Sequence, residues 1–200
     1  MKVAVVGGTG DFGLALAARL VEAGDEVVIG SRDPGRAAEK AREVGAADGA
    51  ANEDSVREVD LVVLATKADG ALATAAALAD AIGETPVLSV ASDLRSAHPD
   101  SLAQRTQELV AAPVVAGLHS LAAGKLVHGR PDEDAFVCGD DAEAKTLALE
   151  LAAKVVAGRA LDAGPLASAR ALEGMTAVIV NLNKRYKGHA GLRVTGLPDA

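Results

Sequence analysis

The sequence is very poor in aromatic residues, with no tryptophan, one tyrosine and two phenylalanines among 200 residues. Half of the residues are nevertheless hydrophobic, so the core must be built mainly from alanine, valine and leucine. We therefore expect a flat ligand to lie mostly against aliphatic side chains. A chain of this length buries enough surface to hold a core without disulfides or a structural metal.

Cysteine, positive charge and long apolar runs are also scarce. Cys138 is the only cysteine, which excludes an intramolecular disulfide and favours a reducing compartment. The net charge of −8 argues against nucleic acid and anionic membranes as partners. No apolar run approaches the ~20 residues of a membrane span, and the first residues lack a signal-peptide pattern. We expect a cytoplasmic protein. His98, His128 and His189 show no ligand spacing with Cys138, so we expect no metal site.

Strands and helices alternate along the first 120 residues. Short β-branched runs predict strands, and segments with apolar residues at helical spacing follow them. The expected strands are 3–6, 27–30, 61–65, 86–90 and 114–117, and the expected helices are 10–23, 34–44 and one that ends near residue 82. This alternation is typical of an α/β fold, a Rossmann-type doubly wound parallel sheet.

The pattern changes after residue 120, which predicts a division into two parts. Residues 1–120 form the expected Rossmann domain, and 121–200 form a smaller C-terminal α/β domain with a strand at 135–140 and helices at 141–156 and 168–186. The middle of the last helix, MTAVIVNL, is apolar nearly all round. Such a helix is either buried or paired with another subunit, so we expect a homodimer.

Residues 8–13, GTGDFG, match the pattern G-x-G-x-x-G. The pattern follows the first strand and opens the first helix, which is the context that dinucleotide binding requires. Gly8 permits the tight turn, Gly10 lets the backbone approach a pyrophosphate, and Gly13 lets helix and strand pack closely. The backbone amides of residues 9–12 would then point at the phosphates.

Arginines replace the usual acid at the end of the second strand. Chains that bind NAD place an Asp or Glu there to hold the ribose hydroxyls, whereas this chain has Ser31, Arg32 and Arg36. A hydroxyl and two guanidinium groups suit the 2′-phosphate of NADP. Asp33 is better placed to cap the helix that begins at Pro34. We therefore predict NADP as the nucleotide.

Several segments together resemble the NADPH-dependent coenzyme F420 reductases, over nearly the whole chain. They are GGTGDFG, GSRDPGR, GLHSLAAGKL, FVCGDDAEAK, LDAGPLASARALEGM and NLNKRYKGHAGLRVTGLP. The resemblance implies an oxidoreductase that transfers a hydride reversibly between NADP(H) and coenzyme F420, an 8-hydroxy-5-deazaflavin. It also implies that residues 121–200 complete the deazaflavin cleft. The segments TKADG and SVASDL depart from the more hydrophobic, proline-containing versions of the family.

The resemblance also implies a set of cofactor-binding residues. The nucleotide contacts fall on Thr9, Gly10, Asp11, Phe12, Ser31, Arg32 and Arg36, with further contacts near Thr66, Lys67 and Ser92. The segment from Leu121 to Ala123 and the stretch around Gly191 would close over the deazaflavin. His119 is either a polar contact of the bound ring or an ordinary loop histidine. We expect no catalytic acid or base, because orienting two rings supplies much of the acceleration of a hydride transfer.

Three other functions stay open at this stage. An NADP-dependent reductase of hydroxy acids or imines would share the first half, but such enzymes generally add a large helical domain. The lysine of the K-x-x-x-N pattern is also absent, because Ala177 precedes Asn181 and Ile179 precedes Asn183 by four residues. A non-catalytic NADP sensor and an NADPH-dependent reductase of FMN or FAD would use the same nucleotide motifs.

Overall fold

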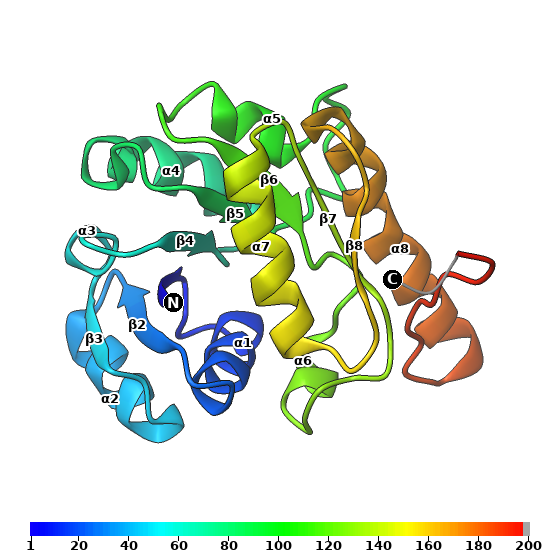
Figure 1. The fold of residues 1–200 in the computed structure, drawn as a ribbon, viewed down its shortest axis with the longest axis horizontal. Helices are drawn as coiled ribbons and strands as arrows, with labels where there is room; N and C mark the ends of the chain where they lie inside the picture. Colours follow the sequence, from blue (N-terminus) through cyan, green and yellow to red (C-terminus); the bar gives the residue numbers. More distant parts are fainter. Residues whose placement is uncertain (198–200) are drawn as a thin grey trace.

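Eight strands form one sheet in the computed structural model, which describes residues 1–197 (Figure 1). The strand order is β3-β2-β1-β4-β5-β6-β7-β8. The strands are β1 (Lys2–Val6), β2 (Glu26–Ser31), β3 (Asp48–Ala51), β4 (Leu61–Leu64), β5 (Val87–Ser89), β6 (Val114–Gly117), β7 (Ala135–Gly139) and β8 (Ala160–Asp162). Neighbouring strands are parallel except β6 and β7, which are antiparallel. The predicted doubly wound α/β fold is confirmed.

The central strand β1 explains why the expected strands lack polar alternation. Val3 and Val5 belong to the core on one face of the sheet, and Ala4 and Val6 belong to the core on the other. All four residues are fully buried. A parallel strand that is covered on both faces needs apolar residues at every position.

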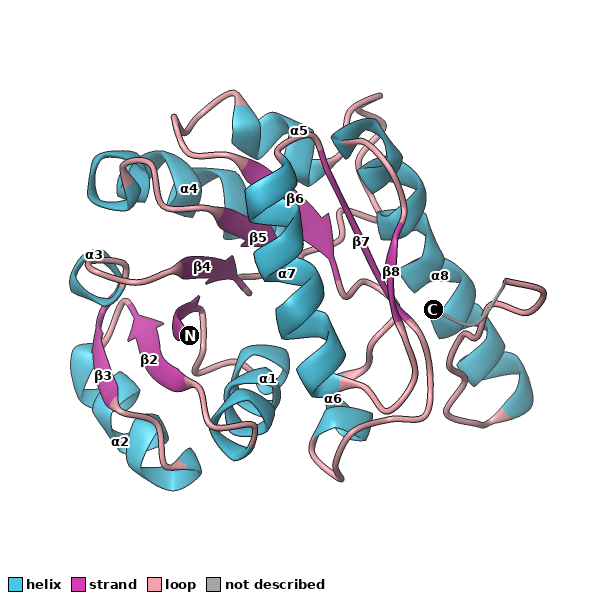
Figure 2. Cartoon of the chain, in the orientation of Figure 1, coloured by secondary structure: helices cyan, strands magenta, loops and turns pink. Residues whose placement is uncertain are grey.

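Helices cover both faces of the sheet (Figure 2). One layer contains α1 (Asp11–Glu22), α2 (Pro34–Val44), α6 (Ala123–Leu126) and α7 (Ala142–Val155). The opposite layer contains α4 (Ala68–Ile82), α5 (Leu102–Gln107) and α8 (Ala169–Tyr186). The shorter α3 (Asn52–Ser55) follows β3, and a 3-10 turn (Leu166–Ser168) precedes α8. Within residues 1–197, no helix has both the length and the apolar character that crossing a membrane requires.

The residues after 120 extend the same sheet. β7 pairs with β6, β8 pairs with β7, and α7 packs against α1 near the start of the chain. The predicted boundary at residue 120 therefore falls after β6, inside one continuous sheet, and the two-domain division stays a prediction. The sequence did not predict β3, β8, α5 or α6, which are all short.

The last long helix, α8, is buried on one side only. Leu172 and Ile179 pack inward and are 5% exposed. Val178, Leu182 and Tyr186 point outward, with exposed fractions of 54%, 36% and 71%. The apolar residues predicted for this helix therefore form two sets. One set packs into the core, and the other forms an exposed apolar strip on the opposite side.

Candidate functional site

The carboxyl end of β1 leads into a glycine turn that opens α1. Gly7 has a φ of +80°, and the turn is closed by hydrogen bonds from Gly8 N to Val5 O (3.1 Å) and from Gly10 N to Gly7 O (3.0 Å). A Cβ at Gly13 would lie 2.7 Å from the Gly7 carbonyl oxygen, so helix and turn are in direct contact. No side chain in the described chain caps the start of α1, which leaves its first backbone amides available to an anion.

The end of β2 places two cations beside this turn. Ser31 is buried at the last position of β2, while Arg32 and Arg36 are exposed. The Arg36 guanidinium donates to Thr9 O at 3.4 Å, so it leans toward the glycine turn. Asp33 accepts a hydrogen bond from Arg36 N at 3.1 Å, which confirms the predicted helix cap. Within residues 1–197, neither the Arg32 nor the Arg36 guanidinium forms an ion pair with a carboxylate, and both line the hollow beside the turn.

These elements enclose a hollow of about 740 Å³, which we call the arginine hollow. It lies at the carboxyl ends of β1, β2 and β4, where ligands bind in open α/β sheets. The predicted site residues that line it are Thr9, Gly10, Asp11, Ser31, Arg32, Arg36, Thr66 and Lys67. Eight of the ten predicted nucleotide contacts therefore lie together, whereas Phe12 and Ser92 do not line this hollow.

Asn52 also lines the arginine hollow, and sequence reasoning missed it. It follows β3 directly, and its Oδ1 lies 3.1 Å from the position that a Cβ at Gly30 would occupy. Its Oδ1 is buried without a hydrogen-bond partner within residues 1–197. The strand that delivers it reads DGAA, which carries too little apolar signal to be recognised.

A second hollow of about 820 Å³ adjoins the first, and we call it the histidine hollow. Thr66 and Lys67, which follow β4, line both hollows. The Thr66 hydroxyl is buried and has no partner among the described residues. The other predicted site residues in the histidine hollow are Phe12, Ser92, His119 and Leu121. An extended ligand could therefore run from one hollow into the other past Thr66.

His119 is buried in the wall of this second hollow and is 6% exposed. Its Nε2 lies 3.2 Å from the Ala91 carbonyl oxygen, and because a carbonyl only accepts, Nε2 carries the proton. Its Nδ1 has no partner within the described chain. Burial lowers the pKa of the imidazole to about 4, although the Ala91 carbonyl opposes that shift. His119 is therefore neutral near pH 7 and offers a lone pair at Nδ1.

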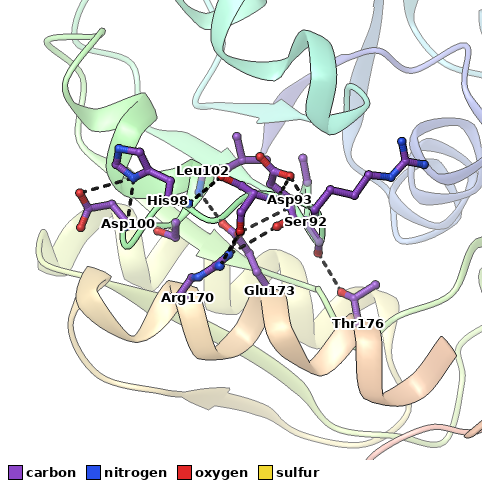
Figure 3. Close-up of polar contacts among 12 residues, drawn as sticks. Ser92, Asp93, His98, Asp100, Leu102, Arg170, Glu173 and Thr176 are labelled. Atoms are coloured by element: carbon purple, nitrogen blue, oxygen red, sulfur yellow. Dashed lines mark hydrogen bonds and ion pairs between the residues drawn. The ribbon is translucent and has the colours of Figure 1, made fainter. Parts of the chain in front are cut away.

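The loop after β5 forms much of the histidine hollow, and α8 holds it in place (Figure 3). The Thr176 and Ser92 hydroxyls lie 2.8 Å apart, and Thr176 also donates to His119 O at 2.8 Å. Glu173 is fully buried and accepts from Leu102 N at 2.7 Å and from Asp93 N at 3.4 Å. Burial raises the pKa of the Glu173 carboxyl, and these backbone donors oppose the shift. One face of α8 thus fixes two walls of the hollow.

Two predicted site residues lie outside both hollows. Ala123 is the first residue of α6, and Gly191 belongs to the irregular stretch after α8. Gly191 packs against the ion pair between Lys125 and Glu133 (2.7 Å), where an added Cβ would collide with the Glu133 carboxylate. The structure therefore places Gly191 beside α6, near Ala123 in the fold but not in the wall of the histidine hollow.

The walls of the two hollows carry buried polar atoms that a ligand could engage. Asn52 Oδ1, Thr66 Oγ1 and His119 Nδ1 are all buried without partners within residues 1–197. A buried polar atom without a partner is costly, and a ligand with its own hydrogen-bonding groups would relieve that cost. Within the same residues no three His, Cys, Asp or Glu side chains are grouped to hold a metal. The arrangement suits two organic cofactors that meet at Thr66.

Comparison with known proteins agrees with this geometry. Residues 2–93 match the family model described as NADP oxidoreductase, coenzyme F420-dependent. The F420-dependent NADP reductase of Methanothermobacter marburgensis is 35% identical over 224 aligned positions that cover both chains completely. The crystal structure of a proposed F420-dependent NADP reductase from Arthrobacter sp. FB24 superposes with a TM-score of 0.86 at 28% identity, covering 98% of this chain and all of that one.

A likeness to another class of reductase concerns the fold alone. An imine reductase from Streptomyces aurantiacus is 23% identical with a TM-score of 0.68. The match covers 91% of this chain but only 61% of the imine reductase, so part of that enzyme lies outside the match. The relative from Methanothermobacter, in contrast, matches from end to end. The chain belongs to the family of coenzyme F420-dependent NADP oxidoreductases.

Proposed function

We propose that this protein is an oxidoreductase that transfers a hydride reversibly between NADP(H) and coenzyme F420. The observation that carries the proposal is the meeting of the two hollows at Thr66 and Lys67. One hollow ends in two arginines and the other in a buried, neutral histidine. The similarity to F420-dependent NADP reductases along the whole chain supports the same reading.

In this proposal NADP lies in the arginine hollow. The backbone around Thr9, Gly10, Asp11 and Phe12 binds the pyrophosphate at the start of α1. Ser31, Arg32 and Arg36 hold the 2′-phosphate, since a guanidinium group forms paired hydrogen bonds with phosphate oxygens. Thr66 and Lys67 then guide the nicotinamide half into the histidine hollow.

The deazaflavin lies in the histidine hollow in the same proposal. When bound, it supplies the ring carbon that accepts or donates the hydride. Ser92, His119 and Leu121 position that ring, and Ala123 and Gly191 belong to the segments that cover it. His119 offers Nδ1 as a hydrogen-bond acceptor, and because of its lowered pKa it lacks the second, acidic proton of an imidazolium near pH 7. The chain's contribution is to align the two rings and exclude water.

The two parts of the chain contribute differently in this proposal. Residues 1–120 carry the NADP contacts and, with Ser92 and His119, one side of the deazaflavin cleft, and 121–200 carry the segments that complete that cleft. We further propose a homodimer through the exposed strip of α8, which is supported by the exposure of Val178, Leu182 and Tyr186. Replacing Leu182 by lysine should then yield monomers in sedimentation. We propose a cytoplasmic location, which the unpaired, buried Cys138 supports.

A turnover assay tests the proposed function. Purified protein is mixed with NADPH and oxidised F420, and the visible absorbance of the deazaflavin is followed. We expect that absorbance to disappear and to return when reduced F420 is mixed with NADP⁺. Parallel reactions with FMN and FAD test the flavin alternative. Tight NADPH binding without turnover of any acceptor would instead indicate a sensor.

A further inference from the structure

Three arginines stand around the loop after β5, and two of them are engaged. The Arg105 guanidinium forms an ion pair with Asp93 at 3.7 Å. The Arg170 guanidinium donates to the backbone oxygens of Asp93 (3.4 Å) and Ser96 (3.1 Å). Arg95, in contrast, makes no side-chain hydrogen bond or ion pair with any residue that the structure describes. It is exposed, and it lines the histidine hollow.

The backbone of Arg95 is nevertheless well held. The Asp93 carboxylate accepts hydrogen bonds from Arg95 N (3.3 Å) and Ser96 N (3.0 Å). The buried Glu173 accepts from Asp93 N at 3.4 Å, which fastens the same turn to α8 (Figure 3). The backbone of Arg95 is therefore held in a fixed turn beside the hollow, while its guanidinium has no partner within residues 1–197.

Among the described residues, neither of the two carboxylates that line the histidine hollow forms an ion pair with Arg95. Asp93 lines the same hollow, but Arg105 and two backbone amides already engage its carboxylate. Asp69, in the first turn of α4, is the other carboxylate in the lining, and it forms no ion pair with Arg95 in the described residues. In a chain with a net charge of −8, a cation that lines a ligand hollow and has no partner within residues 1–197 favours a ligand with an anionic part.

We propose that Arg95 binds the anionic tail of the deazaflavin acceptor, which consists of a phosphodiester followed by glutamyl carboxylates. This inference rests on the proposed function, because it concerns the acceptor of the same site. The 2′-phosphate and pyrophosphate of NADP are assigned to the arginine hollow, whereas Arg95 lines only the histidine hollow. A guanidinium group is suited to both phosphate and carboxylate oxygens.

The expected effect is moderate because Arg95 is exposed to solvent. Exposed ion pairs are weakened by water and salt, so we expect Arg95→Gln to raise the KM for F420 roughly two- to fivefold. The KM for NADPH should stay unchanged. The KM for 8-hydroxy-5-deazariboflavin, which has the same ring but no phosphate or glutamates, should also stay unchanged.

The test compares these two acceptors with four proteins: wild type, Arg95→Gln, Arg95→Lys and the control Arg42→Gln. Arg42 is an exposed arginine of α2 outside both hollows. The KM values come from NADPH-dependent turnover, and dissociation constants come from the fluorescence polarisation of each deazaflavin without NADPH. We expect Arg95→Lys to recover part of the lost F420 affinity. Added salt should weaken F420 binding to wild type more than to Arg95→Gln.

The outcomes separate the two proposals. If wild type reduces neither acceptor, the proposed function is wrong, and so is the proposed binding of the F420 tail by Arg95. If wild type reduces F420 but Arg95→Gln binds it as tightly as wild type does, the proposed function stands and Arg95 does not bind the tail. An equal loss of affinity for both acceptors would also contradict tail binding, because it would mean that Arg95 contacts the ring that both acceptors share.

Discussion

Thr176 and Ser92 are 84 positions apart in the sequence, and their hydroxyl oxygens lie 2.8 Å from each other. The same Thr176 hydroxyl donates to the His119 carbonyl oxygen at 2.8 Å. Ser92 follows β5 and His119 follows β6, so one side chain of α8 joins the loops after two neighbouring strands. The width of the histidine hollow therefore depends on the position of α8 relative to the loops after β5 and β6.

Glu173 is the residue of α8 whose replacement tests this dependence. It is fully buried and accepts two backbone N–H groups of the loop, from Asp93 and Leu102. In Glu173→Gln one carboxylate oxygen becomes an NH2 group that faces a backbone N–H donor. A buried donor without an acceptor destabilises the conformation that contains it by roughly five- to a hundredfold in the equilibrium constant. We expect the KM for F420 to rise roughly tenfold, with a smaller change in the dissociation constant of NADPH.

The control for Glu173 is Glu150→Gln, on the exposed side of α7. Glu173→Gln should also lower the melting temperature, but a residue that only stabilises the fold would show the same effect. A loss of F420 affinity that exceeds the loss of NADPH affinity is the result that identifies Glu173 as a positioning residue. If NADPH and F420 affinities fall by the same factor, Glu173 supports the whole fold and does not set the shape of the acceptor hollow.

The two arginines after β2 should decide between NADPH and NADH. Changing Arg32 or Arg36 to glutamine removes a hydrogen-bonding cation from the proposed 2′-phosphate site, while the rest of the dinucleotide is the same in both forms. We expect each change to raise the KM for NADPH by roughly tenfold and to leave the KM for NADH nearly constant. Arg42→Gln, on the same helix but outside the hollow, is the matched control. Equal effects on both nucleotides would contradict the phosphate role.

An added side chain should impair NADPH binding at Gly10 and the stability of the fold at Gly13. A Cβ at Gly10 would lie 3.4 Å from its nearest neighbour, Gly7 O, and its backbone angles suit a β-branched residue. Gly10→Val should therefore fold, but it should bind NADPH poorly because its side chain stands where the pyrophosphate approaches. Both properties can be measured, by thermal melting and by NADPH titration. Undiminished NADPH affinity in Gly10→Val would contradict the pyrophosphate role.

Gly13→Val provides the comparison for Gly10. A Cβ at Gly13 would lie 2.7 Å from Gly7 O and 2.9 Å from Gly8 Cα. Both are backbone atoms that cannot move aside without opening the turn, so we expect a loss of stability on the order of 1–3 kcal/mol or more. Melting temperatures similar for both variants would mean that α1 can shift away from β1 at little cost.

The parts of the fold that the sequence predicted are those encoded locally. β1, the glycine turn and the start of α1 follow one another within a dozen residues, and the cap at Asp33 depends on an amide only three positions away. The strand ends meet at one edge of the sheet because the strands are parallel. Ser31, Thr66 and His119 could thus be assigned to one region without knowledge of their contacts.

The parts that were missed depend on distant partners or weak local signals. β3 reads DGAA, and β8 spans only Ala160–Asp162, so neither has an apolar pattern. A glutamate on a helix normally faces solvent. Glu173 is buried because Leu102, 71 positions earlier, offers it a backbone amide. Only the packing of α8 against the loop after β5 reveals such a pair.

The burial of His119 should be visible in the pH dependence of stability. Its pKa is lowered from 6.5 to about 4, mainly by burial. The unfolded chain takes up a proton near pH 6.5, and the folded chain does so only near pH 4. His119 therefore makes its whole contribution to the free energy of unfolding above pH 6.5. This contribution decreases as the pH falls from 6.5 to about 4, by about 3 kcal/mol in all.

His119→Gln should remove this contribution and flatten the profile between pH 6.5 and 4. The exposed His128→Gln is the matched control, and denaturant unfolding at several pH values measures both. The difference between the two variants should narrow as the pH falls, because the buried imidazole stabilises the fold only while the unfolded chain is also unprotonated. A constant difference would mean that His119 takes up its proton equally well in the folded chain. The Nδ1 lone pair assigned to the histidine hollow would then be reached by water, and the hollow would be wetter than a hydride transfer requires.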